Sequence, residues 1–112
     1  VGVKIADGKK YIFMVSNKTD TPTELESVPL SQNDVYLKIE CNFHDRIDIA
    51  RFFFSLDGKT WNVIGGELKM EYTLMEHFMG YRFGLFNYAT KTPGGYADFD
   101  YFRVSEKISD MN

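Results

Sequence analysis

The sequence predicts an all-β protein, built as an antiparallel β-sandwich. Roughly seven to nine short strand-like runs follow one another, with turn signals every ~8–12 residues. Aromatic residues make up 16% of the chain, and such residues favour strands. No long segment of helical periodicity separates the runs, which argues against β-α-β units. The length of 112 residues fits one domain.

The first two strands form a predicted hairpin. Residues 1–5 alternate between apolar and other side chains, and Asp7-Gly8 supplies the turn. Residues 11–15 are apolar throughout, so we expect both faces of this strand to be covered. The chain starts directly in this strand pattern without Met, so we expect a processed or excised piece.

The next two runs differ in kind. Residues 24–30 are bracketed by Pro22 and Pro29, which is typical of a short edge strand. Residues 34–43 alternate cleanly, as in a strand with one buried face. The apolar face of this run carries Val35, Leu37, Ile39 and Cys41.

A second hairpin is predicted in the middle of the chain. Residues 48–56 form a strand, residues 57–60 form a turn, and residues 61–64 return. We expect Gly65-Gly66 to break the returning strand. The segment that follows, 67–77, fits either a short helix or a short strand and a loop.

Residues 80–104 hold two further strand-like runs around a Thr-Lys-Thr-Pro-Gly-Gly turn, and both are dense in aromatic residues. One face of the run 81–88 is mostly apolar and fits the core. The other face carries Arg82, Gly84, Phe86 and Tyr88. Rings beside polar groups suit sugars, and a glycine lets a ligand approach closely. A partner domain covering this face explains the pattern equally well. We take Arg82, Tyr88 and Tyr96 as candidate carbohydrate-binding residues.

Asp98 and Asp100 lie two positions apart in the last predicted strand, so their side chains share a face ~6–7 Å apart. Such a pair suits a solvated strand face, a calcium site or a glycosidase acid and base. The solvated face explains the pattern most simply. Catalysis is disfavoured because no third carboxylate is spaced nearby.

Composition excludes several classes of function. The net charge is −3 with basic residues scattered along the chain, which argues against nucleic acid as a partner. No apolar run approaches the ~20 residues of a membrane span. Cys41 is the only cysteine, so no intrachain disulfide and no cysteine-based metal site can form. His44 and His77 lie far apart and indicate no metal site. Neither extracellular nor bacterial cytoplasmic localisation is excluded.

Several motifs resemble one family of modules. The run Ser55 to Trp61, SLDGKTW, looks like a hairpin of concanavalin A-like jelly rolls. Residues 80–90 and 94–102 resemble the C-terminal β-sandwich domain of family 43 glycoside hydrolases, the β-xylosidases and α-arabinofuranosidases. Residues 1–12 also fit that domain. The resemblance covers this whole chain, whereas the family's sandwich has roughly 180–200 residues. It implies that residues 1–112 are the C-terminal part of a sandwich that is incomplete in this chain.

The resemblance implies a non-catalytic accessory domain, which packs on a catalytic β-propeller and binds or positions xylan-type polysaccharide such as arabinoxylan. It also implies a structural calcium at Asp100. The alternatives are a purely structural domain without glycan affinity and, less favoured, a small glycosidase that uses Asp98 and Asp100. Half a sandwich exposes strand edges and an apolar face, so we expect self-association through residues 1–15 and 49–56.

Overall fold

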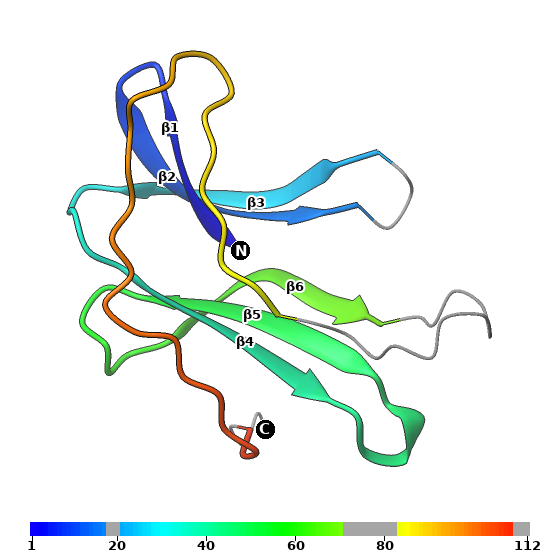
Figure 1. Ribbon diagram of the computed structural model, residues 1–112. Helices are drawn as coiled ribbons and strands as arrows, with labels where there is room; N and C mark the ends of the chain where they lie inside the picture. The colour runs from blue at the N-terminus through cyan, green and yellow to red at the C-terminus, as the bar shows by residue number, and fades with distance from the viewer. Residues whose placement is uncertain (18–20, 71–82, 109–112) are drawn as a thin grey trace. The chain divides into compact units, whose positions relative to one another are not determined.

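The computed structural model describes residues 1–17, 21–70 and 83–108. Figure 1 shows two separate β-sheets. A single turn of 3-10 helix, η1 (His44–Arg46), lies between the fourth and fifth strands. The strands are β1 (Gly2–Ala6), β2 (Lys9–Ser16), β3 (Thr23–Leu30), β4 (Tyr36–Asn42), β5 (Ile49–Ser55) and β6 (Asn62–Lys69). The predicted all-β fold class is confirmed. Among the described residues, no helix is long and apolar enough to cross a membrane.

The first sheet is an antiparallel meander in the order β1-β2-β3. The β1–β2 turn is the predicted one, because Ala6 pairs with Lys9 across Asp7 and Gly8. Both turn residues have positive φ, 53° and 76°, as two-residue hairpin loops of the primed type require. This short turn fixes the register of β1 with β2.

The second sheet is also an antiparallel meander, in the order β4-β5-β6. Strand β5 is its centre, so the backbone of β5 is paired on both sides. Residues 49–56 therefore have no free strand edge for self-association, and association through their apolar face stays a prediction. The outer strands of the two sheets are β1, β3, β4 and β6.

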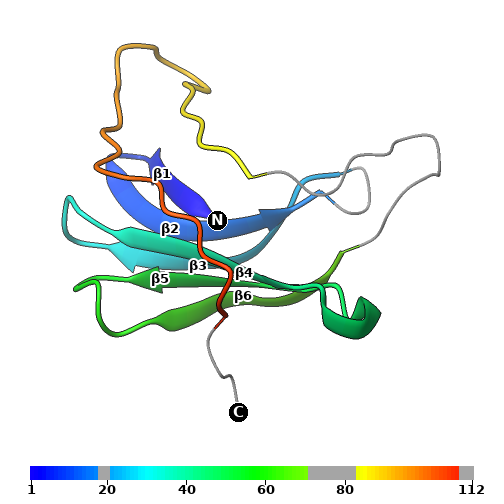
Figure 2. The ribbon, with the colours of Figure 1, turned by 60° about the horizontal axis from the view of Figure 1, so that its bottom comes forward.

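The core lies between the two sheets, which Figure 2 shows from another side. Strand β6 contacts both β2 and β3. Because alternate residues of a strand point to opposite faces, each sheet contributes one apolar face to this core. The side chains buried in this core are Ile12, Met14, Leu30, Ala50, Phe52, Phe54, Ile64 and Met70.

The expectation that residues 11–15 are covered on both faces holds only in part. Ile12 and Met14 are buried, whereas Tyr11 and Phe13 on the other face are half-buried and Val15 is exposed. Lys4 explains some of the cover on that face, since its ammonium lies 5.3 Å from the centre of the Phe13 ring.

Strand β4 keeps part of its inner face exposed. Leu37 pairs with Phe54 and Ile39 pairs with Phe52, so both share the face of buried core residues. Yet the two side chains are 39% and 42% exposed. Val3 and Ile5 of β1 are likewise exposed, although Val3 pairs with buried Ile12. The apolar inner faces therefore extend beyond the overlap of the two sheets.

Gly65-Gly66 does not break the strand, which corrects the sequence prediction. Strand β6 continues to Lys69, and its register with β5 shifts between Arg51 and Phe53. Both glycines have positive φ, 78° and 75°, so they form an irregularity within the strand rather than its end. Within the ambiguous segment 67–77, residues 67–69 belong to β6, and residues 71–77 lie outside the described residues.

The two aromatic runs of residues 80–104 are not strands in the described residues 83–108. Residues 83–107 belong to a second compact unit, separate from the one formed by residues 1–70. A strand exists only when its backbone N–H and C=O groups pair with a neighbour. Residues 83–88 and 96–104 thus have the side-chain alternation of strands, but within the described residues they form no hydrogen-bonded strand pair.

Candidate functional site

Two of the predicted sugar-binding residues, Tyr88 and Tyr96, lie in the second unit, in a segment without regular secondary structure. Tyr88 is 71% exposed and its ring stacks on that of Phe86, with the ring centroids 5.8 Å apart and an interplanar angle of 20°. Two adjacent exposed rings offer an apolar surface of the kind on which sugar C–H groups pack. Arg82 lies outside the described residues.

Tyr96 is the most exposed of the candidate rings, with 85% of its surface accessible. In the described part of the chain no ring contact joins it to Tyr88 or Phe86. The structure therefore brings Tyr88 together with Phe86, and it leaves Tyr96 apart from them. The sequence alternation had placed Phe86 and Tyr88 on one face, and that pairing is retained.

Asp98 and Asp100 are both exposed. No group of three or more His, Cys, Asp or Glu side chains comes together within the described residues. Calcium takes six to eight oxygen ligands, so a calcium ion at Asp100 would need further ligands, and calcium there stays a prediction.

The outer face of the second sheet carries an ordered set of aromatic and charged side chains. The Lys38 ammonium lies 4.6 Å from the Phe53 ring centre and 4.4 Å from that of Trp61, and it also pairs with Glu40 at 3.2 Å. Because Lys38 lies over both rings, these contacts serve the packing of the sheet. The sequence signal for this face was the alternation of polar side chains along residues 36–42.

The SLDGKTW hairpin has a structural role, which depends on the Asp57 side chain. The Asp57 carboxylate accepts hydrogen bonds from the backbone N–H groups of Lys59 and Thr60, each at 2.8 Å, and from the Ser55 hydroxyl at 2.9 Å. These backbone hydrogen bonds and the Ser55 bond lower the pKa of Asp57 to about 2. The carboxylate thus closes the turn between β5 and β6.

Cys41 packs as expected of a structural thiol. It pairs with buried Ala50 and lies half-buried against the core. Burial raises the pKa of this thiol, which keeps it protonated and unreactive at neutral pH.

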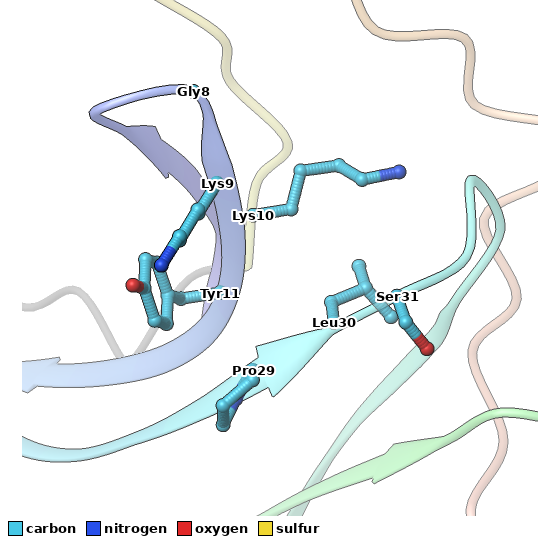
Figure 3. Close-up of a pocket in the computed structure, with 7 residues that line it drawn as sticks. All are labelled: Gly8, Lys9, Lys10, Tyr11, Pro29, Leu30 and Ser31. Carbon is cyan, nitrogen blue, oxygen red and sulfur yellow. The ribbon is translucent and has the colours of Figure 1, made fainter.

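A hollow that the sequence patterns do not predict lies beside the β1–β2 turn. Its volume is about 370 Å³, and Figure 3 shows its lining residues. The volume falls within the range of small-molecule sites, roughly 300–1,000 Å³. Its lining residues are Gly8, Lys9, Lys10, Tyr11, Pro29, Leu30 and Ser31. The sequence signal was the Lys-Lys-Tyr run, but Pro29 comes from another strand and only the register of β2 with β3 reveals it.

Comparison with known proteins agrees with this fold. The family model of the β-xylosidase C-terminal concanavalin A-like domain matches residues 1–105. A solved structure described as a bifunctional GH43-CE protein from Bacteroides eggerthii is 59% identical, with a TM-score of 0.77. The match covers 83% of this chain and 12% of that protein, so the chain spans a small part of its length. No curated protein matches.

The match of the family model over nearly the whole chain agrees with the two antiparallel sheets and with the hairpin at Asp57. Together these observations show that the chain belongs to the family of β-xylosidase C-terminal concanavalin A-like domains.

Proposed function

We propose that this chain acts as a non-catalytic accessory domain of a hemicellulose-degrading glycoside hydrolase of family 43, and that it binds or positions xylan-type polysaccharide. The observation that carries the proposal is the family match over residues 1–105. The exposed ring pair of Phe86 and Tyr88 supports a glycan as the ligand, because sugars present C–H faces to aromatic rings.

The residues that we propose to contact the glycan are Arg82, Tyr88 and Tyr96. Tyr88 and Phe86 provide the apolar platform, Tyr96 provides a second exposed ring, and Arg82 provides hydrogen-bond donors for hydroxyl groups. Replacing an aromatic side chain on which a nucleic-acid base stacks weakens binding by about 1–3 kcal/mol. We expect a comparable loss of binding free energy for a ring on which a sugar packs.

Affinity electrophoresis and calorimetry with xylan and arabinoxylan test the proposal. We expect retention of the wild-type chain and weaker retention of Arg82→Ala, Tyr88→Ala and Tyr96→Ala. Tyr101→Ala is the matched control, since Tyr101 is an exposed tyrosine of the same unit that packs under Arg103 instead. Equal retention of all four variants and wild type would show that the site is misplaced.

A second candidate is a purely structural role, in which the domain packs on the catalytic β-propeller without glycan affinity. The exposed inner-face side chains Leu37 and Ile39 favour it, because exposed apolar surface marks packing sites. Co-expression with a family 43 catalytic propeller distinguishes the two. The structural role predicts a stable complex that Leu37→Lys and Ile39→Lys weaken, together with no retention on polysaccharide.

A further inference from the structure

The hollow beside the β1–β2 turn has an apolar floor. Tyr11 and Pro29 are direct cross-strand partners, so their rings lie on the same face of the first sheet. Figure 3 shows the side chains of Lys9 and Tyr11 on one side of β2, and that of Lys10 on the other. A tyrosine ring next to a proline ring forms a flat apolar surface with a hydroxyl at its rim. That combination suits a pyranose ring, whose C–H groups pack on apolar rings while its hydroxyl groups form hydrogen bonds.

The charged side chains that line this hollow are positive. Two of the lining residues are lysines and none is acidic, although the whole chain carries a net charge of −3. A surplus of positive charge at one place on an acidic protein favours an anionic ligand there.

The two lysines have different roles. The Lys10 ammonium donates to the Gln32 carbonyl oxygen and to Asn33 Oδ1, both at 2.7 Å, so it ties β2 to the loop after β3. The Lys9 side chain is exposed, and within the described residues its ammonium makes no hydrogen bond or ion pair. The Lys4 ammonium also lies over the Tyr11 ring, 6.0 Å from the ring centre, but it pairs with Glu24. Lys9 is thus the lysine beside Tyr11 whose charge is available for a ligand.

We infer that this hollow binds a uronic acid unit of a polysaccharide, with the sugar ring on Tyr11 and Pro29 and the carboxylate at Lys9. The inference rests on the proposed function, since it assumes that the domain meets glycans, and it adds a second site and a charged class of sugar. Charge-assisted hydrogen bonds from an ammonium to a carboxylate are about twice as strong as neutral ones.

The test compares three ligands on the chain of residues 1–112 by calorimetry. They are a xylooligosaccharide bearing one glucuronic acid, the same compound with its carboxyl group reduced to an alcohol, and inorganic phosphate. The variants are Lys9→Gln and, as the matched control, Lys59→Gln. Lys59 is an exposed lysine in the β5–β6 turn, outside the hollow.

We expect the acidic oligosaccharide to bind roughly three- to tenfold more tightly than its reduced form, an advantage that Lys9→Gln removes and Lys59→Gln retains. In ¹H–¹⁵N spectra, the amide signals of Lys9, Lys10 and Tyr11 shift on titration with the acidic compound. This mapping does not depend on any variant.

Equal binding of the acidic and reduced compounds, or shifts confined to other residues, would overturn the uronic acid site and leave the proposed function standing. Phosphate binding as tight as that of the acidic sugar would also overturn it, because the aromatic floor would then have no role. A complete lack of binding by both oligosaccharides would remove the proposed function together with this site.

Discussion

The packing of β6 against β2 makes a sharp prediction at Gly65. A Cβ atom built on Gly65 meets three atoms of the Met14 side chain, with Cγ and Sδ at 2.7 Å and Cβ at 2.9 Å. Met14 is only 1% exposed, and its own Cβ is among the atoms in contact, so the side chain cannot simply swing away. Gly65→Ala should therefore force the two sheets apart or strain the core.

The neighbouring glycine provides the control. Gly66 has nearly the same φ as Gly65, 75° against 78°, but a Cβ atom on Gly66 meets nothing within 4 Å. An alanine at positive φ costs about 1–2 kcal/mol in either position. A reduced entropy of the unfolded chain offsets about 0.4–1 kcal/mol of that cost. These two contributions are the same at both positions and cancel in the comparison.

The difference between the two variants isolates the contact with Met14. Overpacking a close-packed core costs about 1–3 kcal/mol, so Gly65→Ala should lower the free energy of unfolding by that much more than Gly66→Ala. For a domain near this size, each 1 kcal/mol corresponds to about 4–8 °C in melting temperature. Urea and thermal unfolding of the two variants measure this difference. Equal destabilisation by the two alanines would refute the packing of β6 on Met14.

Other predictions concern the core, the turn, association and catalysis. Phe52→Ala should lower the free energy of unfolding by about 3–5 kcal/mol in urea titrations, because Phe52 is buried, and a smaller loss would indicate a loosely packed core. The Asp57 pKa falls from 3.8 to about 2 on folding, so its stabilising contribution is complete above pH 3.8 and is lost as the pH falls through about 2. Asp57→Asn should remove this part of the pH dependence of unfolding, and an unchanged profile would contradict the hydrogen bonds of the turn. Exposed apolar residues and strand edges predict concentration-dependent association in analytical ultracentrifugation, weakened by Leu37→Lys, whereas a compact monomer at all concentrations would contradict it. We expect no hydrolysis of aryl-xylosides by this chain, and activity abolished by Asp98→Asn would support the glycosidase alternative instead.

The sequence predicted the six paired strands well because a two-residue period is a local property. The run 48–56 became β5 (Ile49–Ser55), and the run 24–30 became β3 (Thr23–Leu30). The turns at Asp7-Gly8 and Asp57-Gly58 were also predictable, since glycine at positive φ follows an aspartate in both.

The remaining features depend on contacts between distant parts of the chain. Strand β6 continues past Gly65-Gly66 because residues 67–69 pair with β5, and Gly65 itself lies against Met14 of the other sheet. The alternation of residues 34–43 assigned Leu37 and Ile39 to the correct face, but their exposure depends on how far one sheet extends past the other. Residues 80–104 have a strand-like pattern, and only a backbone partner can turn such a pattern into a strand.

The candidate site was predictable to the same limited extent. Alternation placed Phe86 and Tyr88 on one face, and their rings stack in the structure. The hollow at Lys9 and Tyr11 was not predictable, because its floor needs the register that brings Pro29 opposite Tyr11. The glycan affinity of either place is a proposal that binding experiments decide.

The central claim is that this domain associates with hemicellulose without cleaving it. Affinity electrophoresis of the chain of residues 1–112 in gels containing xylan or arabinoxylan tests that claim most directly. The claim predicts that the wild-type chain is retarded relative to a gel without polysaccharide, and that Tyr88→Ala is retarded less. Identical migration of the wild-type chain in all gels would contradict it and would leave the structural role as the explanation.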